Sequence, residues 1–115
     1  MDKNTNSKLI TSYLPHGTGA PLIKLLKDET GICTGNVKNC RGTGSSAHNL
    51  NASGYDSWIE VDVLDVVVDA DRAEEVFNFI YEKAGIREGN HGFIMQSNLI
   101  GATNFSLPNL PEEEF

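Results

Sequence analysis

The stretch Trp58–Val68 constrains the fold more than any other part of this sequence. Its first half alternates apolar and acidic side chains: Ile59, Val61 and Val63 against Glu60 and Asp62. Its second half is the apolar run Val66-Val67-Val68. A period of two predicts a strand with one buried face, and an uninterrupted β-branched run predicts cover on both faces. We therefore expect a strand inside a sheet, with Glu60 and Asp62 on its solvent face.

Two amphipathic helices are predicted. Directly after this strand, apolar residues recur at helical spacing: Ala73, Val76, Phe77, Ile80 and Ala84. The segment Asp71–Glu74 has the pattern of a capping box at the start of that helix. Earlier in the chain, Pro21 suits a first helical turn and Gly31 a helix end, with an apolar stripe between them formed by Leu22, Leu25 and Leu26.

Three further strands complete the pattern. They are predicted at Leu9–Leu14, where Pro15 stops the strand, at Ile32–Arg41 and at Gly92–Met95. The order strand, helix, strand, strand, helix, strand predicts an α+β ferredoxin-like βαββαβ sandwich. Such a sheet has helices on one face only, and a small domain often covers the other face by forming oligomers.

Two segments between these elements are candidates for binding. Residues 42–56 consist mainly of Gly, Ser, Thr, Ala and Asn, which predicts a long mobile loop between the second and third strands. Loops of this length are uncommon in small domains and are often functional. The second segment is Glu88–Phe93, whose glycines leave backbone amides able to face an anion.

Length and charge restrict the class of protein. A chain of 115 residues fits one domain, spanning 1–115, with one core. Nine basic against sixteen acidic side chains give a net charge of -7, which argues against nucleic acid or an anionic membrane as partner. No run is long and apolar enough to insert in a membrane, so we expect a cytoplasmic protein. Residues 1–7 are expected to be a flexible N-terminus and residues 103–115 an extended acidic tail.

Cys33 and Cys40 lie seven residues apart in one predicted strand. Their side chains should then point to opposite faces of the sheet, which argues against a disulfide between them. We expect two buried or half-buried thiols.

In this arrangement the sequence resembles the P-II signal-transduction family, whose members are trimeric ferredoxin-like sensors that read adenine nucleotides and control transporters and enzymes through a long loop. The resemblance covers Lys8 to about Met95. It is carried by Lys8-Leu9-Ile10-Thr11 followed by Pro15, by Gly31 and then Val37-Lys38 ahead of the long loop, by Val66-Val67-Val68 before the second helix, and by Gly89-Asn90-His91-Gly92-Phe93-Ile94. The last group resembles the family's Gly-Asp-Gly-Lys loop.

The resemblance implies an effector site between subunits. An adenine pocket would be lined by Gly31, Ile32, Cys33 and Val67, and phosphates would be held by Asn39, Cys40, Arg41 and Gly42 together with Gly89, Asn90, His91 and Gly92. Arg41 is able to clamp a phosphate with two hydrogen bonds, or is a solvated arginine at a strand end. The partner-binding loop would present Gly44, Ser45, Ser46 and Tyr55. Tyr55 is either comparable to a tyrosine that the family modifies or a hinge aromatic.

Two departures from the family pattern bear on the effector. Gly92 stands where the family has a lysine, and Gln96–Thr103 has no counterpart of the family's arginines. Each lost charge-assisted hydrogen bond costs about 1.5 to 3 kcal/mol, so binding of a triphosphate should suffer most. AMP, ADP, a cyclic nucleotide or bicarbonate is then favoured over ATP, and inorganic-carbon uptake is a possible pathway by the same resemblance.

The resemblance therefore predicts a homotrimeric sensor of an adenine nucleotide, with or without bicarbonate, that regulates a membrane transporter. The alternative of the same fold is a metal-responsive CutA-like trimer. His16, His48 and His91 are far apart in sequence and show no recognised ligand spacing, so no metal ligand is assigned. An enzyme is not expected, because the sequence has no recognisable nucleophile, base and phosphate-loop pattern.

Overall fold

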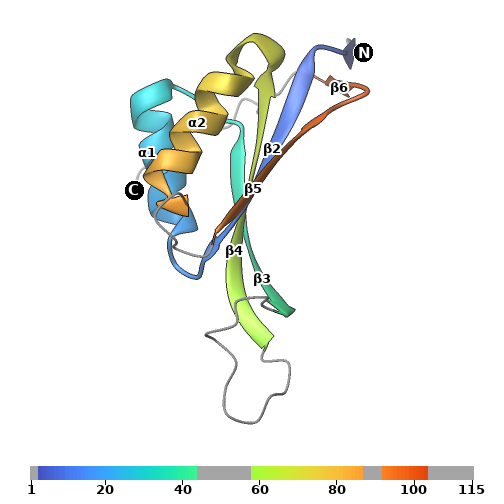
Figure 1. The fold of residues 1–115 in the computed structure, drawn as a ribbon. Helices are drawn as coiled ribbons and strands as arrows, with labels where there is room; N and C mark the ends of the chain where they lie inside the picture. The colour runs from blue at the N-terminus through green and yellow to red at the C-terminus, as the bar shows by residue number, and fades with distance from the viewer. Residues whose placement is uncertain (1–2, 44–57, 87–91, 104–115) are drawn as a thin grey trace, which may run out of the picture.

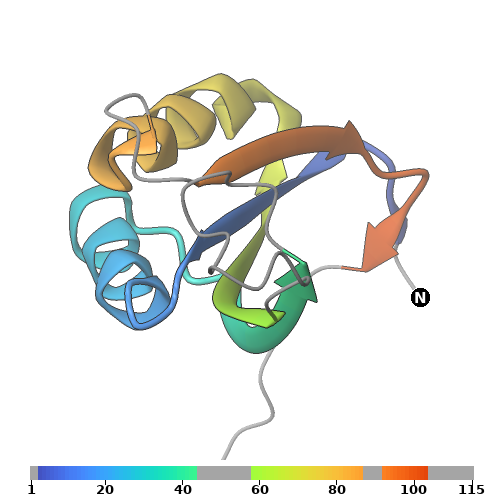
Figure 2. The same ribbon diagram turned by 60° about the horizontal axis from the view of Figure 1, so that its bottom comes forward.

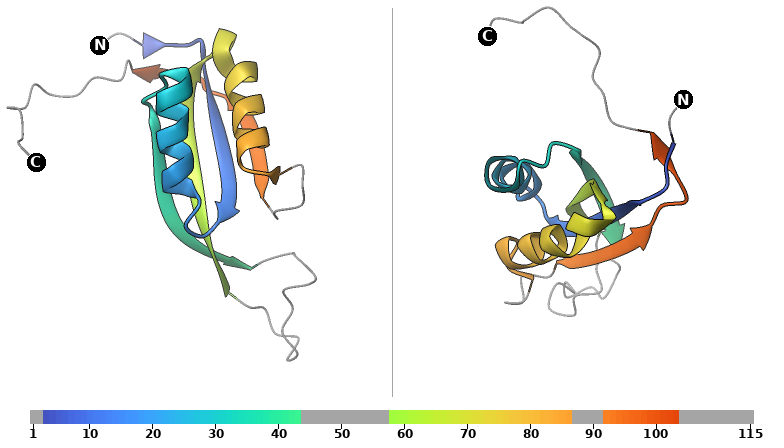
Figure 3. Two further views of the ribbon diagram at one scale, coloured as in Figure 1. Left: turned by 90° about the vertical axis from the view of Figure 1, so that its left-hand side faces the viewer. Right: turned by 90° about the horizontal axis from the view of Figure 1, so that it is seen from above.

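The computed structural model describes residues 3–43, 58–86 and 92–103. Four antiparallel strands form a sheet in the order β3-β4-β2-β5, and two helices cover one of its faces (Figure 1, Figure 3). In chain order the elements are β1 (Lys3–Asn4), β2 (Ser7–Pro15), α1 (Gly19–Thr30), β3 (Gly35–Thr43), β4 (Trp58–Asp69), the 3₁₀ helix η2 (Ala70–Arg72), α2 (Ala73–Lys83), β5 (Phe93–Asn98) and β6 (Ala102–Thr103). The predicted ferredoxin-like class is confirmed.

The core lies between the helices and one face of the sheet. Its buried side chains come from alternate positions of β2 and β4 and from one stripe on each helix, and they include Ile10, Leu14, Leu22, Leu26, Leu64, Val66, Val76 and Ile80. β4 pairs with β3 along one edge and with β2 along the other. Within the run Val66-Val67-Val68, Val66 has partners in both β2 and β3, whereas Val67 and Val68 pair with β2 alone. The predicted cover on both faces is wrong: Val66 and Val68 lie in the core, but Val67, on the face without helices, is only half-buried.

Gly31 ends α1 as predicted. Its φ of +76° is left-handed, and its N–H donates to the carbonyl of Lys27 at 3.0 Å. Glycine adopts this conformation without steric cost, which explains why the helix stops there.

Several boundaries differ from the predicted ones. β3 begins at Gly35 rather than Ile32, because the turn after Gly31 uses three more residues, and it runs on to Thr43, so residues 42 and 43 belong to a strand rather than to the long loop. β5 reaches Asn98 rather than Met95. The predicted capping box at Asp71–Glu74 is wrong: the N-cap of α2 is Arg72, and its side chain makes no capping hydrogen bond.

The two ends of the chain contribute a small ribbon. Lys3–Asn4 pairs with Ala102–Thr103, and the ribbon lies beyond the sheet on the side away from the helices (Figure 2). Residues 1–7 were expected to be flexible, but they supply β1 and, with Ser7, the start of β2. Thr103 was expected to begin the tail, but it belongs to β6. In the part of the chain that the structure describes, no helix has the length and apolar character needed to cross a membrane.

Candidate functional site

The sheet face opposite the helices, here called the open face, carries several exposed apolar side chains. Tyr13, Phe93 and Met95 are 41%, 56% and 43% exposed. The residue after Tyr13, Leu14, is in the core, so strand alternation directs Tyr13 away from the helices, and Phe93 lies beside it in the register. The two rings contact each other at 6.2 Å between centroids. An apolar surface of this kind usually marks an interaction site.

A polar chain crosses the same open face. The Thr11 hydroxyl donates to Asp65 Oδ1 at 2.7 Å, and Lys38 Nζ lies 3.2 Å from Asp65 Oδ2. Three strands are thereby connected by side chains, since Thr11, Asp65 and Lys38 come from β2, β4 and β3. The chain gives the open face a fixed pattern of charge among apolar neighbours.

On the helix side, Asp62 is buried, and the prediction that it lies on a solvent face is wrong. It is 3% exposed, and its Oδ2 accepts hydrogen bonds from the N–H groups of Gly17 at 3.0 Å and Gly19 at 2.9 Å. A carboxylate at the start of α1 satisfies two backbone amides and complements the positive end of the helix dipole. A Cβ on Gly19 would lie 2.8 Å from Val37 Cγ1, so glycine permits this close approach.

Around Asp62 lies a group of charged residues that we call the loop-base cluster: His16, Arg41, Glu60 and Asp62. His16 Nδ1 is 3.4 Å from Asp62 Oδ1, and His16 Nε2 is 3.7 Å from Glu60 Oε2. The Arg41 guanidinium is 3.5 Å from Glu60 Oε1. Arg41 and Glu60 face each other across the β3–β4 ladder, two positions from the pair Thr43 and Trp58 at which the described parts of the two strands end. Of the predicted phosphate ligands, Arg41 is thus already engaged with a carboxylate.

The predicted adenine residues gather at the opposite end of the sheet. Gly31 caps α1, Ile32 and Cys33 lie in the turn before β3, and the Thr34 hydroxyl donates to the carbonyl of Val67. Cys33 is exposed rather than buried and lies outside any strand, whereas Cys40 is half-buried as expected. Both cysteines are free thiols.

A single chain does not bring the predicted site together. Asn39, Cys40, Arg41 and Gly42 lie near the far end of β3, and the strand rise places Gly42 about 23 Å from Gly35. Gly92 adjoins β5 on the other edge of the sheet, and three strand spacings put it about 14 Å from Asn39. The other predicted residues, Gly89, Asn90, His91, Gly44, Ser45, Ser46 and Tyr55, lie outside the described residues.

Gly92 is closely packed against its neighbours. A Cβ at this position would lie 2.8 Å from Ile86 Cγ1 and 3.2 Å from the carbonyl oxygen of Tyr13. A lysine there would require Ile86 or the sheet to move. The missing positive charge is therefore tied to the packing of this chain.

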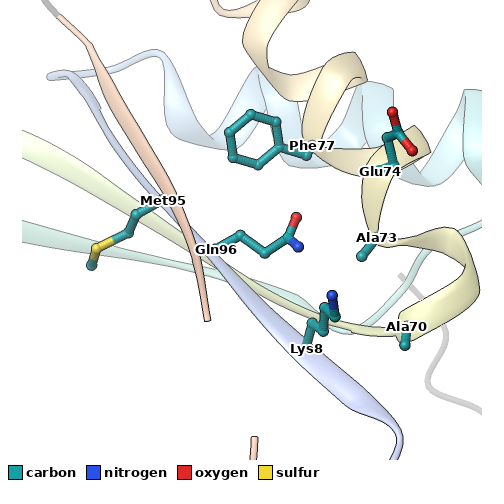
Figure 4. Close-up of a pocket in the computed structure, with 7 residues that line it drawn as sticks. All are labelled: Lys8, Ala70, Ala73, Glu74, Phe77, Met95 and Gln96. Carbon is teal, nitrogen blue, oxygen red and sulfur yellow. The ribbon is translucent and has the colours of Figure 1, made fainter. Parts of the chain in front are cut away.

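A cavity of about 550 Å³ lies elsewhere in the described part of the chain (Figure 4). It lies between the start of α2 and strands β2 and β5 and is lined by Lys8, Ala70, Ala73, Glu74, Phe77, Met95 and Gln96. None of the predicted effector residues lines it. Within the described ranges, no three His, Cys, Asp or Glu side chains are placed to hold a metal ion.

No protein-family model matches this sequence, and no curated protein matches it. At the level of structure, the chain is similar to crystalline Arabidopsis thaliana PII bound to citrate. The match has a TM-score of 0.63 and 21% sequence identity, and it covers 84% of this chain and 79% of the plant protein. The chain therefore has the ferredoxin-like fold of a PII protein.

Proposed function

We propose that this chain is a non-enzymatic, cytoplasmic regulator of the PII type. In this proposal it forms a homotrimer, binds a small anionic effector between subunits and controls a membrane transporter through residues 44–57. The observation that carries the proposal is the PII fold with an uncovered sheet face.

A site between subunits accounts for the separation of the predicted ligands. The adenine end, near Gly31 and Val67, and the phosphate end, near Arg41, are too far apart in one chain for a single nucleotide to reach both. A neighbouring copy can supply one end while the first copy supplies the other. The open face favours such an assembly, because Tyr13, Phe93 and Met95 lose exposed apolar surface when a second copy covers them.

The charge of the loop-base cluster favours an effector with few negative charges. Arg41 is paired with Glu60, the cluster holds a second carboxylate in Asp62 next to His16, and the whole chain carries a net charge of -7. These carboxylates would repel the negative charges of a triphosphate, and few positive side chains would be available to neutralise them. AMP, ADP or cyclic AMP, with or without bicarbonate, fits better than ATP.

Isothermal titration calorimetry tests the proposal. The purified protein is titrated with AMP, ADP, ATP and cyclic AMP, each with and without bicarbonate, with citrate, which the similar plant structure contains, and then with divalent metals. Micromolar binding of a nucleotide, with ATP weaker than ADP, is expected. Tight metal binding without any nucleotide binding would instead identify a metal-responsive CutA-like trimer.

Amide hydrogen exchange tests the regulatory half of the proposal. A saturating effector should lower exchange across residues 44–57, because contacts near Arg41 and Gly42 would offset the entropy cost of ordering the adjoining segment. Binding without any change in exchange there would separate the effector from control through this segment.

A further inference from the structure

Glu60 is shared between two partners. Its Oε1 lies 3.5 Å from the Arg41 guanidinium and its Oε2 lies 3.7 Å from His16 Nε2. The Glu60 side chain is 52% exposed, so it can move between the two without disturbing the core. A carboxylate bound to Arg41 competes with any anion that uses the same guanidinium.

His16 also faces an acceptor that lacks a donor. Asp62 Oδ1 is buried and has no hydrogen-bond partner in the described part of the chain, although His16 Nδ1 is only 3.4 Å away. A neutral imidazole has one N–H, whereas a protonated one donates from both nitrogens. Protonated His16 can therefore serve Asp62 Oδ1 and Glu60 at the same time.

Protonation of His16 also changes the net charge of the loop-base cluster. With His16 neutral, one positive side chain and two carboxylates give a net charge of -1. A proton on His16 brings the sum to zero and gives Glu60 a second cationic partner. Histidine is the side chain that ordinarily makes this change between pH 5 and 8.

We propose, on the basis of the function proposed above, that Glu60 determines the anion affinity of the effector site by occupying Arg41. Protonation of His16 then draws Glu60 away and releases Arg41 to the effector. Among the residues that the structure describes, the charged groups that face His16 are Glu60 and Asp62 from β4, with Arg41 from β3 beyond Glu60. Lys38 and Asp65 pair with each other on the open face and do not compete. Effector binding thereby becomes sensitive to acidification.

Calorimetric titration of the full chain with ADP at about pH 8 and about pH 5.5, at fixed ionic strength, tests this. Proteins are compared with one another at the same pH, so that protonation of ADP itself cancels. Glu60→Gln should bind ADP about two- to fivefold more tightly than wild type at the higher pH, the range expected for an exposed ion pair. Glu82→Gln, which removes an equal charge from an exposed position on α2, is the matched control and should bind like wild type.

The His16→Gln variant tests the role of the proton on His16. It should match wild type at the higher pH and bind about two- to fivefold more weakly at the lower pH. Arg41→Gln should weaken ADP binding at both pH values. In the Arg41→Gln background, Glu60→Gln should no longer raise the ADP affinity.

Three outcomes overturn the inference. If Glu60→Gln and Glu82→Gln change the ADP affinity equally, the effect is one of overall charge. If His16→Gln binds ADP like wild type at both pH values, His16 does not select the partner of Glu60. If Glu60→Gln still raises the ADP affinity in the Arg41→Gln background, Glu60 acts through a group other than Arg41. In all three cases ADP still binds and the proposed function stands. Absence of ADP binding by wild type and Glu60→Gln at both pH values refutes the proposed function and this inference together.

Discussion

At the scale of single residues, Asp62 shows what a sequence pattern leaves open. Acidic residues that alternate with valines suggest a solvent face, yet strand parity places Asp62 with Leu64 and Val66, which are both fully buried. That Asp62 shares a face of the strand with Leu64 and Val66 follows from their even spacing and could have been predicted from the sequence. The need for a buried carboxylate could not, because its donors, the amides of Gly17 and Gly19, come from a turn more than forty residues away.

Replacement of Asp62 should reveal this role. Asp62→Ala leaves two amides without their acceptor and should lower the free energy of unfolding by about 1 to 3 kcal/mol. Urea denaturation at fixed protein concentration measures the loss. Asp28→Ala, at an exposed position of α1, is the control and should stay within about 0.5 kcal/mol of wild type. Equal stability of the two variants would contradict the anchoring role of Asp62.

Gly92 illustrates the same limit for the candidate site. The sequence shows a glycine at this position, but the close packing around it involves Ile86 and the Tyr13 carbonyl, which come from two other parts of the chain. Local patterns identified candidate site residues such as Arg41. They did not reveal that Glu60 and His16 surround it, since that depends on strand register and on the turn after β2.

At the scale of elements, periodicity predicted the four main strands and both helices in the right order, because each is long enough to repeat its pattern. β1 and β6 were missed, since two residues carry no period and their pairing joins the two ends of the chain. The helices are joined at their ends by Arg72. Its guanidinium donates to the carbonyl of Thr30 at 3.0 Å and to both carboxylate oxygens of Glu75.

The Arg72–Glu75 pair should make part of the stability depend on pH. The hydrogen bond from Arg72, aided by its charge, lowers the pKa of Glu75 below its ordinary value of 4.5. A lowered folded-state pKa stabilises the protein above the ordinary pKa, and the contribution disappears as the pH falls through the folded-state value. Glu75→Gln should therefore melt below wild type at neutral pH and approach it in acid.

Thermal denaturation of both proteins across this range measures the effect. Glu74→Gln is the control, because Glu74 occupies the same first turn of α2 without an ion pair among the described residues and so accounts for the helix dipole. A deficit for Glu75→Gln that equals that of Glu74→Gln at every pH would show that Arg72 contributes nothing.

At the scale of the whole molecule, the open face is the feature that a single chain leaves unfinished. Helices cover one side of the sheet only, and the other side combines exposed aromatic side chains with the Thr11–Asp65–Lys38 chain. The sequence predicted that this face would need a partner. Which residues meet across it depends on a second copy, and no pattern within one chain contains that information.

Analytical ultracentrifugation should detect a trimer of the wild-type protein at micromolar concentration. Phe93→Lys places a charge on the open face, whose burial is costly, and should shift the protein towards monomer. Asn78→Lys adds the same charge at an exposed position of α2 and should leave the trimer intact. A monomeric wild type, or a trimer that tolerates Phe93→Lys, would show that the open face is not the subunit interface.

The pairing of Thr43 with Trp58 has an evolutionary consequence. Thr43 and Trp58 are paired in the β3–β4 register, so the chain leaves β3 and enters β4 at neighbouring positions of the sheet. Doubling the number of residues between Thr43 and Trp58 should cost only about 0.6 kcal/mol in closure entropy, so insertions and deletions there should leave the sheet nearly unaffected. Selection can then change the segment's length and composition without repacking the core. Descendants of one ancestral scaffold can acquire new binding partners while their buried residues stay the same.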